Sequence, residues 1–152
     1  MIDQPIAHTT DGRPLYDNTA TVVVGLVLSK DGVLTIVRQT EPGIGLISLP
    51  GGYHMRGETW QKALAREVLE ETGVVVDENT ITQFRDVITD EYGNNLIFGV
   101  CRAITPLDMS VTDGESTNVM YVRDVGSPML WAFPLHHDSA EKIVGVLRDL
   151  DI

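Results

Sequence analysis

The stretch from Thr59 to Gly73 is the part of this sequence that most restricts the fold. It reads TWQKALAREVLEETG, with good helix formers throughout and no Gly or Pro before its last residue. Thr59 is suited to cap the first turn, and Gly73 stands where a C-cap glycine belongs. Leu64 and Val68 share one side of the helix at 100° per residue. The sequence therefore predicts a helix over residues 60–72 that packs on a sheet.

Apolar, β-branched segments on both sides of this helix predict the strands of that sheet. Residues 19–29 and 33–39 are expected to pair as a hairpin, because the Asp31-Gly32 turn signal lies between them. Further strands are expected at about 46–49, 81–90, 96–104 and 118–125. Strands with one central and one terminal helix indicate an α/β sandwich.

The two ends of the chain are expected to differ. Residues 1–18 are polar, contain two prolines and show no sustained period, so they are predicted to be an irregular lead-in. Residues 19–152 are predicted to form one domain. The final segment, HHDSAEKIVGVLRDL, is predicted to be a helix with Asp138 and Glu141 as its capping box.

Charge and composition limit the partners. The chain has 22 acidic and 11 basic residues, a net charge of -11, and the basic residues are scattered. A long nucleic acid is therefore not expected as a partner, whereas a small phosphorylated ligand is compatible with the charge if divalent cations accompany it. No apolar run approaches the roughly 18 residues of a membrane span. The single Cys101 fits a reducing compartment, and the protein is expected to be cytoplasmic.

Three glutamates lie close together on the predicted helix. Glu67, Glu70 and Glu71 cover an arc of roughly 100°. Like charges at this spacing repel one another by roughly 0.2–0.5 kcal/mol per pair. A solvated acidic face would explain three such glutamates if the helix were considered alone.

The segment before the helix changes this interpretation. LPGGYHMRGE contains Gly51 and Gly52 in succession, then Gly57 and Glu58. Glycines allow a tight turn and let a phosphate or a metal approach the backbone closely. Mg²⁺ takes carboxylates, waters and substrate phosphate oxygens. The loop and helix together therefore predict a site for Mg²⁺ and a pyrophosphate, in which bound cations would relieve the repulsion among the glutamates.

The spacing of these residues resembles a known family signature. Gly52 is followed after five residues by Glu58, and after seven more by REVLEETGV, which ends at Val74. This pattern resembles the signature of the Nudix hydrolases at every fixed position. The resemblance implies an α/β/α sandwich with a mixed central β-sheet. It also implies attack of water on a nucleoside diphosphate that is linked to another moiety.

The resemblance assigns roles to individual residues. It implies Mg²⁺ or Mn²⁺ as the cofactor, with four donors: Glu67, Glu70, Glu71 and the carbonyl of Gly52. Arg66 matches the arginine that orients a ligand glutamate, and Glu58 matches a glutamate that supports the loop. Glu70, Glu67 and Arg66 are accordingly expected to be catalytic. Which carboxylate serves as the general base is left open.

Several candidates lie outside the signature. Glu115 and Asp113 occupy a region where family members often place a further base or metal ligand, and Glu115 is preferred over Asp113 for that role. The alternative is a solvated turn. Arg38 is expected either to bind a phosphate or to form a surface ion pair. Tyr53, directly after Gly51 and Gly52, is expected to line the substrate site with them.

Other residues have simpler explanations. Asp90 and Glu91 are expected to form a turn, with a role in the site as the alternative. His136 and His137 are expected to be surface histidines that flank a helix cap rather than groups that stack on a base. Three residues are expected to pack in or against the core: Trp60, Trp131 and Cys101.

The sequence contains only weak indications of a particular substrate. No aromatic residue precedes the Pro-Gly-Gly lead-in, and Thr89 occupies the place where hydrolases of adenosine diphosphoribose often have proline. Tyr92 stands near the place where hydrolases of dinucleoside polyphosphates tend to have tyrosine. A generic nucleoside diphosphate derivative ranks first as the substrate, and adenosine diphosphoribose ranks second. A nucleotide-derivative sensor and an acidic interaction protein are the alternatives to an enzyme, and a homodimer is compatible with the family.

Overall fold

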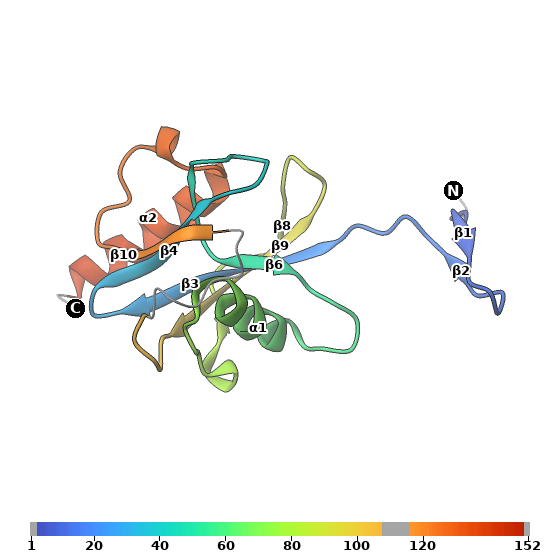
Figure 1. Ribbon diagram of the computed structural model, residues 1–152, viewed down its shortest axis with the longest axis horizontal. Coiled ribbons are helices and arrows are strands. Elements are labelled where there is room, and N and C mark those ends of the chain that lie inside the picture. Colours follow the sequence, from blue (N-terminus) through green and yellow to red (C-terminus); the bar gives the residue numbers. More distant parts are fainter. Residues whose placement is uncertain (1–2, 108–115, 151–152) are drawn as a thin grey trace.

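A mixed sheet between two helices forms the body of the protein. The computed structural model describes residues 3–107 and 116–150 (Figure 1). Within these residues the sheet has eight strands: β3 (Thr21–Ser29), β4 (Gly32–Arg38), β5 (Ile47–Ser48), β6 (Gly51–Tyr53), β7 (Thr82–Gln83), β8 (Ile88–Thr89), β9 (Asn95–Arg102) and β10 (Ser116–Val122). Two short 3₁₀ helices, η1 (Glu78–Thr80) and η2 (Pro128–Leu130), lie in its connections.

The sheet divides at β3. Its order is β10-β4-β3-β9-β7, with β5 on β4, β8 on β9 and β6 on β3. The start of β3 pairs with β6 through residues 22–24, whereas its end pairs with β4 through residues 28 and 29. β3 and β9 are parallel and every other pair of the sheet is antiparallel. The chain from β5 to β6 therefore crosses between the two halves.

Each face of the sheet is covered by one helix. Val23 and Val27 of β3 pack with the first helix, α1 (Trp60–Thr72), and Val24 and Leu26 pack with the last, α2 (Pro134–Asp149). This alternation follows from the period of two along a strand. Figure 1 shows the two helices on opposite sides of the sheet, which confirms the predicted three-layer sandwich.

Two glycines let α1 approach the sheet closely. Gly25 of β3 and Gly99 of β9 are register partners beneath the helix. A Cβ at Gly99 would lie 2.7 Å from Leu64 and 2.9 Å from Trp60, closer than side chains tolerate. The missing side chains therefore fix the height of α1, and with it the position of the glutamates.

The predicted ends of α1 are confirmed, but the predicted start of α2 is not. The Thr59 hydroxyl accepts a hydrogen bond from the Lys62 amide at 3.1 Å, and Gly73 adopts a left-handed φ of 75°. α2 begins at Pro134 without a side-chain cap. The predicted capping box was wrong because proline can start a helix two residues before His136. Asp138 instead pairs with Arg85 and Lys142.

The strand expected over residues 81–90 is broken. Gln83 faces Gly99 and Ile88 faces Leu96, so five steps along this segment meet three along β9. The surplus residues bulge from the ladder and leave only β7 and β8 paired. Within the expected lead-in, β1 (Ala7–His8) and β2 (Pro14–Leu15) form a small hairpin that stands apart from the body (Figure 1). None of the helices in the described ranges is both long and apolar enough to cross a membrane.

Candidate active site

Gly51 and Gly52 bring strand β6 against the glutamate helix. A Cβ at Gly51 would overlap the backbone carbonyl of Val23 on the neighbouring strand, so glycine is required for this pairing. The Gly51 amide donates a hydrogen bond to Glu71 Oε1 at 2.8 Å. Glu71 is only 6% exposed, and this bond satisfies part of a carboxylate that would otherwise be costly to bury.

Glu67 lies against Gly52. A Cβ on Gly52 would overlap all three terminal atoms of the Glu67 side chain. The carboxylate therefore occupies space that any other residue at position 52 would fill. The absence of that side chain leaves the Gly52 backbone beside a carboxylate whose side chain is 17% exposed.

Arg66 holds the carboxylates of the loop and the helix in place. Its guanidinium donates to both oxygens of Glu58, at 2.7 and 3.1 Å, and to Glu67 at 2.8 Å. Glu70 lies 3.6 Å away, and the Tyr53 carbonyl accepts a further bond at 3.2 Å. A single arginine therefore joins β6, the loop after it and two glutamates of the helix, as expected for an orienting residue.

Charge pairing shifts the pKa of both partners. Hydrogen bonds from Arg66, and then from the Met55 amide, lower the pKa of Glu58 to about 2. The Glu58 hydrogen bonds likewise raise the pKa of Arg66 above its ordinary value. Glu58 is thus ionised throughout the neutral range and closes the loop over residues 55–58.

The donor set is suited to a hard divalent cation. Carboxylates and a backbone carbonyl are the oxygen ligands that Mg²⁺ and Mn²⁺ prefer. Among the described residues, however, no three His, Cys, Asp or Glu side chains are gathered closely enough to form a ready metal site. Glu70 is 53% exposed and can change rotamer, so a cation can draw it toward Glu67.

Arg38 contacts a different part of the protein. Its Nε donates to the Pro42 carbonyl at 2.6 Å, and its guanidinium carbon lies 5.1 Å from the centre of the Phe133 ring. Within the described ranges Arg38 has no ion pair, so the expected surface ion pair is not found, and binding of a phosphate stays a prediction. The arginine packs on an aromatic ring instead.

The remaining predicted residues have different outcomes. The Tyr53 side chain is 56% exposed beside the site. Glu115 and Asp113 fall outside the described residues, so their roles stay predictions. Asp90 accepts hydrogen bonds from the amides of Tyr92 and Asn94, both at 2.9 Å, which is turn chemistry.

The two histidines of α2 are buried, so the prediction of surface histidines was wrong. Each is 7% exposed. His136 Nδ1 accepts a hydrogen bond from the Leu49 amide at 3.1 Å, and burial lowers the His136 pKa to about 3. The signal was present in the sequence, because His136 continues the helical period of Ala140 and Ile143.

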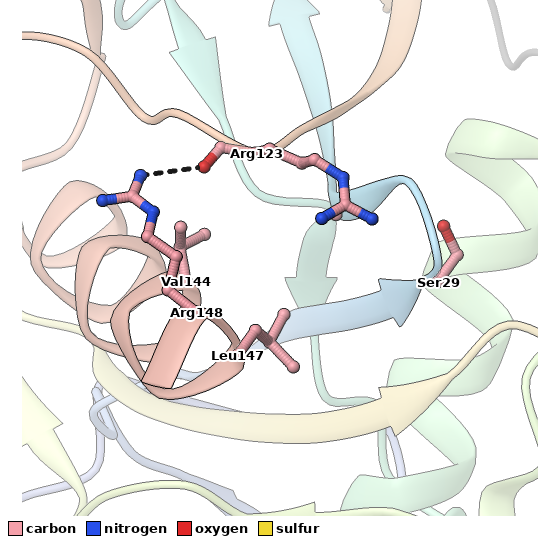
Figure 2. Close-up of a pocket in the computed structure, with 6 residues that line it drawn as sticks. Ser29, Arg123, Val144, Leu147 and Arg148 are labelled. Atoms are coloured by element: carbon pink, nitrogen blue, oxygen red, sulfur yellow. Dashed lines mark hydrogen bonds between the residues drawn. The ribbon is translucent and has the colours of Figure 1, made fainter. Parts of the chain in front are cut away.

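The core predictions are confirmed. Trp131 and Cys101 are buried, and Trp60 is partly buried against the core. A separate hollow of about 130 Å³ lies between the β3–β4 turn and the end of α2, lined by Ser29, Arg123, Val144, Leu147 and Arg148 among others (Figure 2). None of the predicted site residues lines it.

The chain is similar in sequence to known proteins. The NUDIX domain family model matches residues 18–134. An ADP-ribose pyrophosphatase of Methanocaldococcus jannaschii is 39% identical over 61 residues, which cover 40% of this chain and only 36% of that protein.

Solved structures share the fold. A NUDIX hydrolase from Nitrosomonas europaea superposes with a TM-score of 0.75 at 21% identity, over 88% of this chain and 74% of that one. A bifunctional NMN adenylyltransferase/ADP ribose pyrophosphatase from Francisella tularensis, solved with AMP and a Mn ion, has a TM-score of 0.60 at 22% identity. That match covers 88% of this chain and 42% of the other.

Proposed function

Since the chain belongs to the NUDIX domain family, we propose that it is a divalent-metal-dependent hydrolase of the pyrophosphate bond in nucleoside diphosphate derivatives. The observation that carries the proposal is the contact of Gly51 and Gly52 with Glu71 and Glu67, braced by Arg66. This contact places acidic side chains beside a backbone that a phosphate can approach.

Four groups would hold the metal: Glu67, Glu70, Glu71 and the Gly52 carbonyl. A bound Mg²⁺ or Mn²⁺ would neutralise phosphate charge and lower the pKa of an attacking water. The requirement for a cation also follows from the net charge of -11, which by itself repels a pyrophosphate.

The chain's own residues would perform the other tasks. Arg66 fixes the direction of Glu67 through a 2.8 Å bond, and Glu58 fixes Arg66. Gly51 and Gly52 present backbone without side chains. Glu70, the most exposed of these carboxylates, is our candidate to accept the proton of water. Glu115 is the alternative base. Glu115→Gln should keep its turnover if Glu70 is the base and lose it if Glu115 is the base, whereas Glu70→Gln removes a proposed metal ligand in either case.

Adenosine diphosphoribose is the second-ranked substrate after a generic nucleoside diphosphate derivative. The name of the Methanocaldococcus relative supports it, as does the AMP bound to the Francisella structure. A catalytically weak sensor is the alternative function. The presence of all three signature glutamates favours the enzyme, because a sensor has no need to keep metal ligands.

The test is release of phosphate or nucleotide from a substrate panel with Mg²⁺, with Mn²⁺ and with EDTA. The panel contains nucleoside triphosphates, oxidised purine nucleotides, adenosine diphosphoribose, dinucleoside polyphosphates, nicotinamide dinucleotides and nucleotide sugars. We expect release from one group that stops with EDTA. Tight binding of one compound without any release would favour the sensor.

A further inference from the structure

Residues from three distant segments form an aromatic cluster at the start of α2. Phe133 is the residue before the helix, Tyr92 lies in the β8–β9 turn, and Arg38 ends β4. The Tyr92 and Phe133 rings meet edge to face with their centres 6.2 Å apart, and the Arg38 guanidinium lies over Phe133. We refer to Tyr92, Phe133 and Arg38 as the aromatic platform.

The platform is held in place by a buried histidine and is partly exposed to solvent. His136 packs against Phe133 with ring centres 4.7 Å apart and is itself buried. Phe133 is half-buried, whereas Tyr92 is 54% exposed. Arg38 uses Nε to bind the Pro42 carbonyl, and no hydrogen bond or ion pair within the described residues engages its two terminal nitrogens. An exposed tyrosine ring therefore lies in the same cluster as arginine N–H groups that have no partner among the described residues.

A short stretch of chain joins this platform to the glutamates. His136 accepts the hydrogen bond of the Leu49 amide, and two residues later Gly51 donates to Glu71. Residues 49–51 cross the divided sheet, so one end of the crossing contacts the α2 side and the other contacts α1. In Figure 1 the loop after β4 and the β8–β9 turn rise on the α2 side, with β6 between them and α1.

We propose that the aromatic platform is the subsite that binds the nucleobase of the substrate. Aromatic side chains stack on any base, and arginine N–H groups donate to base or ribose oxygens. The proposal rests on the proposed function, since it assigns the nucleoside half of the molecule whose pyrophosphate would lie at the glutamates. It makes Tyr92, Phe133 and Arg38 determinants of specificity.

A purely structural role makes a different prediction. If Phe133 only packed the start of α2, its replacement would lower stability and weaken all ligands alike. Tyr92 tests this best, because so exposed a side chain contributes little to the core. The two roles are thus separated by whether the loss of affinity depends on the base.

The probes are AMP and ribose 5-phosphate, which differ only in the base. Their dissociation constants are measured by calorimetry with Mg²⁺ for the wild type, Tyr92→Ala, Tyr92→Phe and Phe133→Leu. Tyr16→Ala is the matched control, since Tyr16 is 42% exposed and lies on the lead-in. Thermal unfolding of each variant establishes that it is folded.

We expect AMP to bind the wild type more tightly than ribose 5-phosphate. Tyr92→Ala and Phe133→Leu should weaken AMP by roughly tenfold and leave ribose 5-phosphate unchanged, as expected for loss of one stacking contact. Tyr92→Phe should restore AMP binding, and Tyr16→Ala should have no effect.

Two results would overturn the inference: equal affinity of the wild type for the two probes, or equal weakening of both probes in folded variants. Either can occur while the wild type hydrolyses a pyrophosphate in the panel, in which case the proposed function stands without this subsite. Base-dependent binding without any hydrolysis would support the proposed nucleobase subsite and contradict the proposed hydrolase function.

Discussion

The glutamate helix and the aromatic platform are built in opposite ways. Arg66, Glu67, Glu70 and Glu71 lie within six consecutive residues of one helix, whereas Arg38, Tyr92 and Phe133 come from segments about forty or more residues apart. The first region is charged and cross-linked by Arg66, and the second is aromatic. A local signature can therefore specify the chemistry, while tertiary structure alone assembles the surface that we assign to recognition.

Removal of a carboxylate from the helix should have the largest effect. Glu70→Gln should lower turnover by more than about 100-fold, beyond what loss of an outer-shell partner costs. Thermal stability should be unchanged, because this side chain is 53% exposed. The matched control is Glu141→Gln on α2, whose side chain is 66% exposed. Full activity of Glu70→Gln would contradict the assignment of Glu70 to the active site.

Substitution of Gly52 should mainly affect catalysis, whereas substitution of Gly51 should mainly affect folding stability. Gly52→Ala should lower turnover by about 10- to 100-fold, because its methyl group displaces the Glu67 carboxylate. Gly51→Ala should instead lower the free energy of unfolding by about 1–3 kcal/mol, because its methyl group meets backbone rather than a flexible side chain. Activity per folded molecule and urea unfolding measure the two effects, and an interchange of the two outcomes would refute this division.

On the platform side, loss of His136 should affect stability. His136→Leu leaves the Leu49 amide without its acceptor in a buried position, which costs about 1–3 kcal/mol. His8→Leu, at an exposed strand, is the control. Urea unfolding of both variants provides the measurement. A His136→Leu protein as stable as the wild type would mean that the hydrogen bond does not anchor the crossing.

The same two regions should lose stability in different pH ranges. The pKa of His136 is depressed to about 3 by burial, so the unfolded state binds more protons as pH falls from 6.5, and stability declines in that range. The pKa of Glu58 is depressed to about 2 by Arg66, so its contribution is present above 4.5 and is lost as pH falls toward 2. Thermal unfolding is measured between pH 2 and 7. The stability of His136→Leu should fall less than that of the wild type as pH decreases from 6.5, and the stability of Glu58→Gln should fall less as pH decreases from 4.5 toward 2. If neither variant changes the profile, other groups control it.

Much of the fold was predictable because its determinants are local. The cap at Thr59, the stop at Gly73 and the Asp31-Gly32 turn are each written within a few residues. The continuous run of apolar, β-branched residues in β3 likewise predicted a buried strand. The parallel pairing of β3 with β9 joins residues more than 70 positions apart, and neither this pairing nor the crossing of β5 to β6 has a local signal.

The site divides in the same manner. The glutamates, Arg66 and the glycines were all identified from spacing, and the structure brings them into contact. Phe133 and its stacking with Arg38 were missed, because nothing near position 133 indicates a partner at position 38. His136 was misassigned because the expected capping box placed the helix start after it. The helix in fact begins at Pro134, so the period of buried residues includes His136.

Binding of Mn²⁺ tests the central claim most directly. The electron paramagnetic resonance signal of free Mn²⁺ reports how much cation each protein removes from solution, independently of any turnover. We predict that the wild type and Tyr92→Ala bind Mn²⁺ equally and that Glu70→Gln binds it far more weakly. Equal binding by Glu70→Gln, or loss of binding in Tyr92→Ala, would contradict the division between a metal-binding helix and a separate platform for recognition.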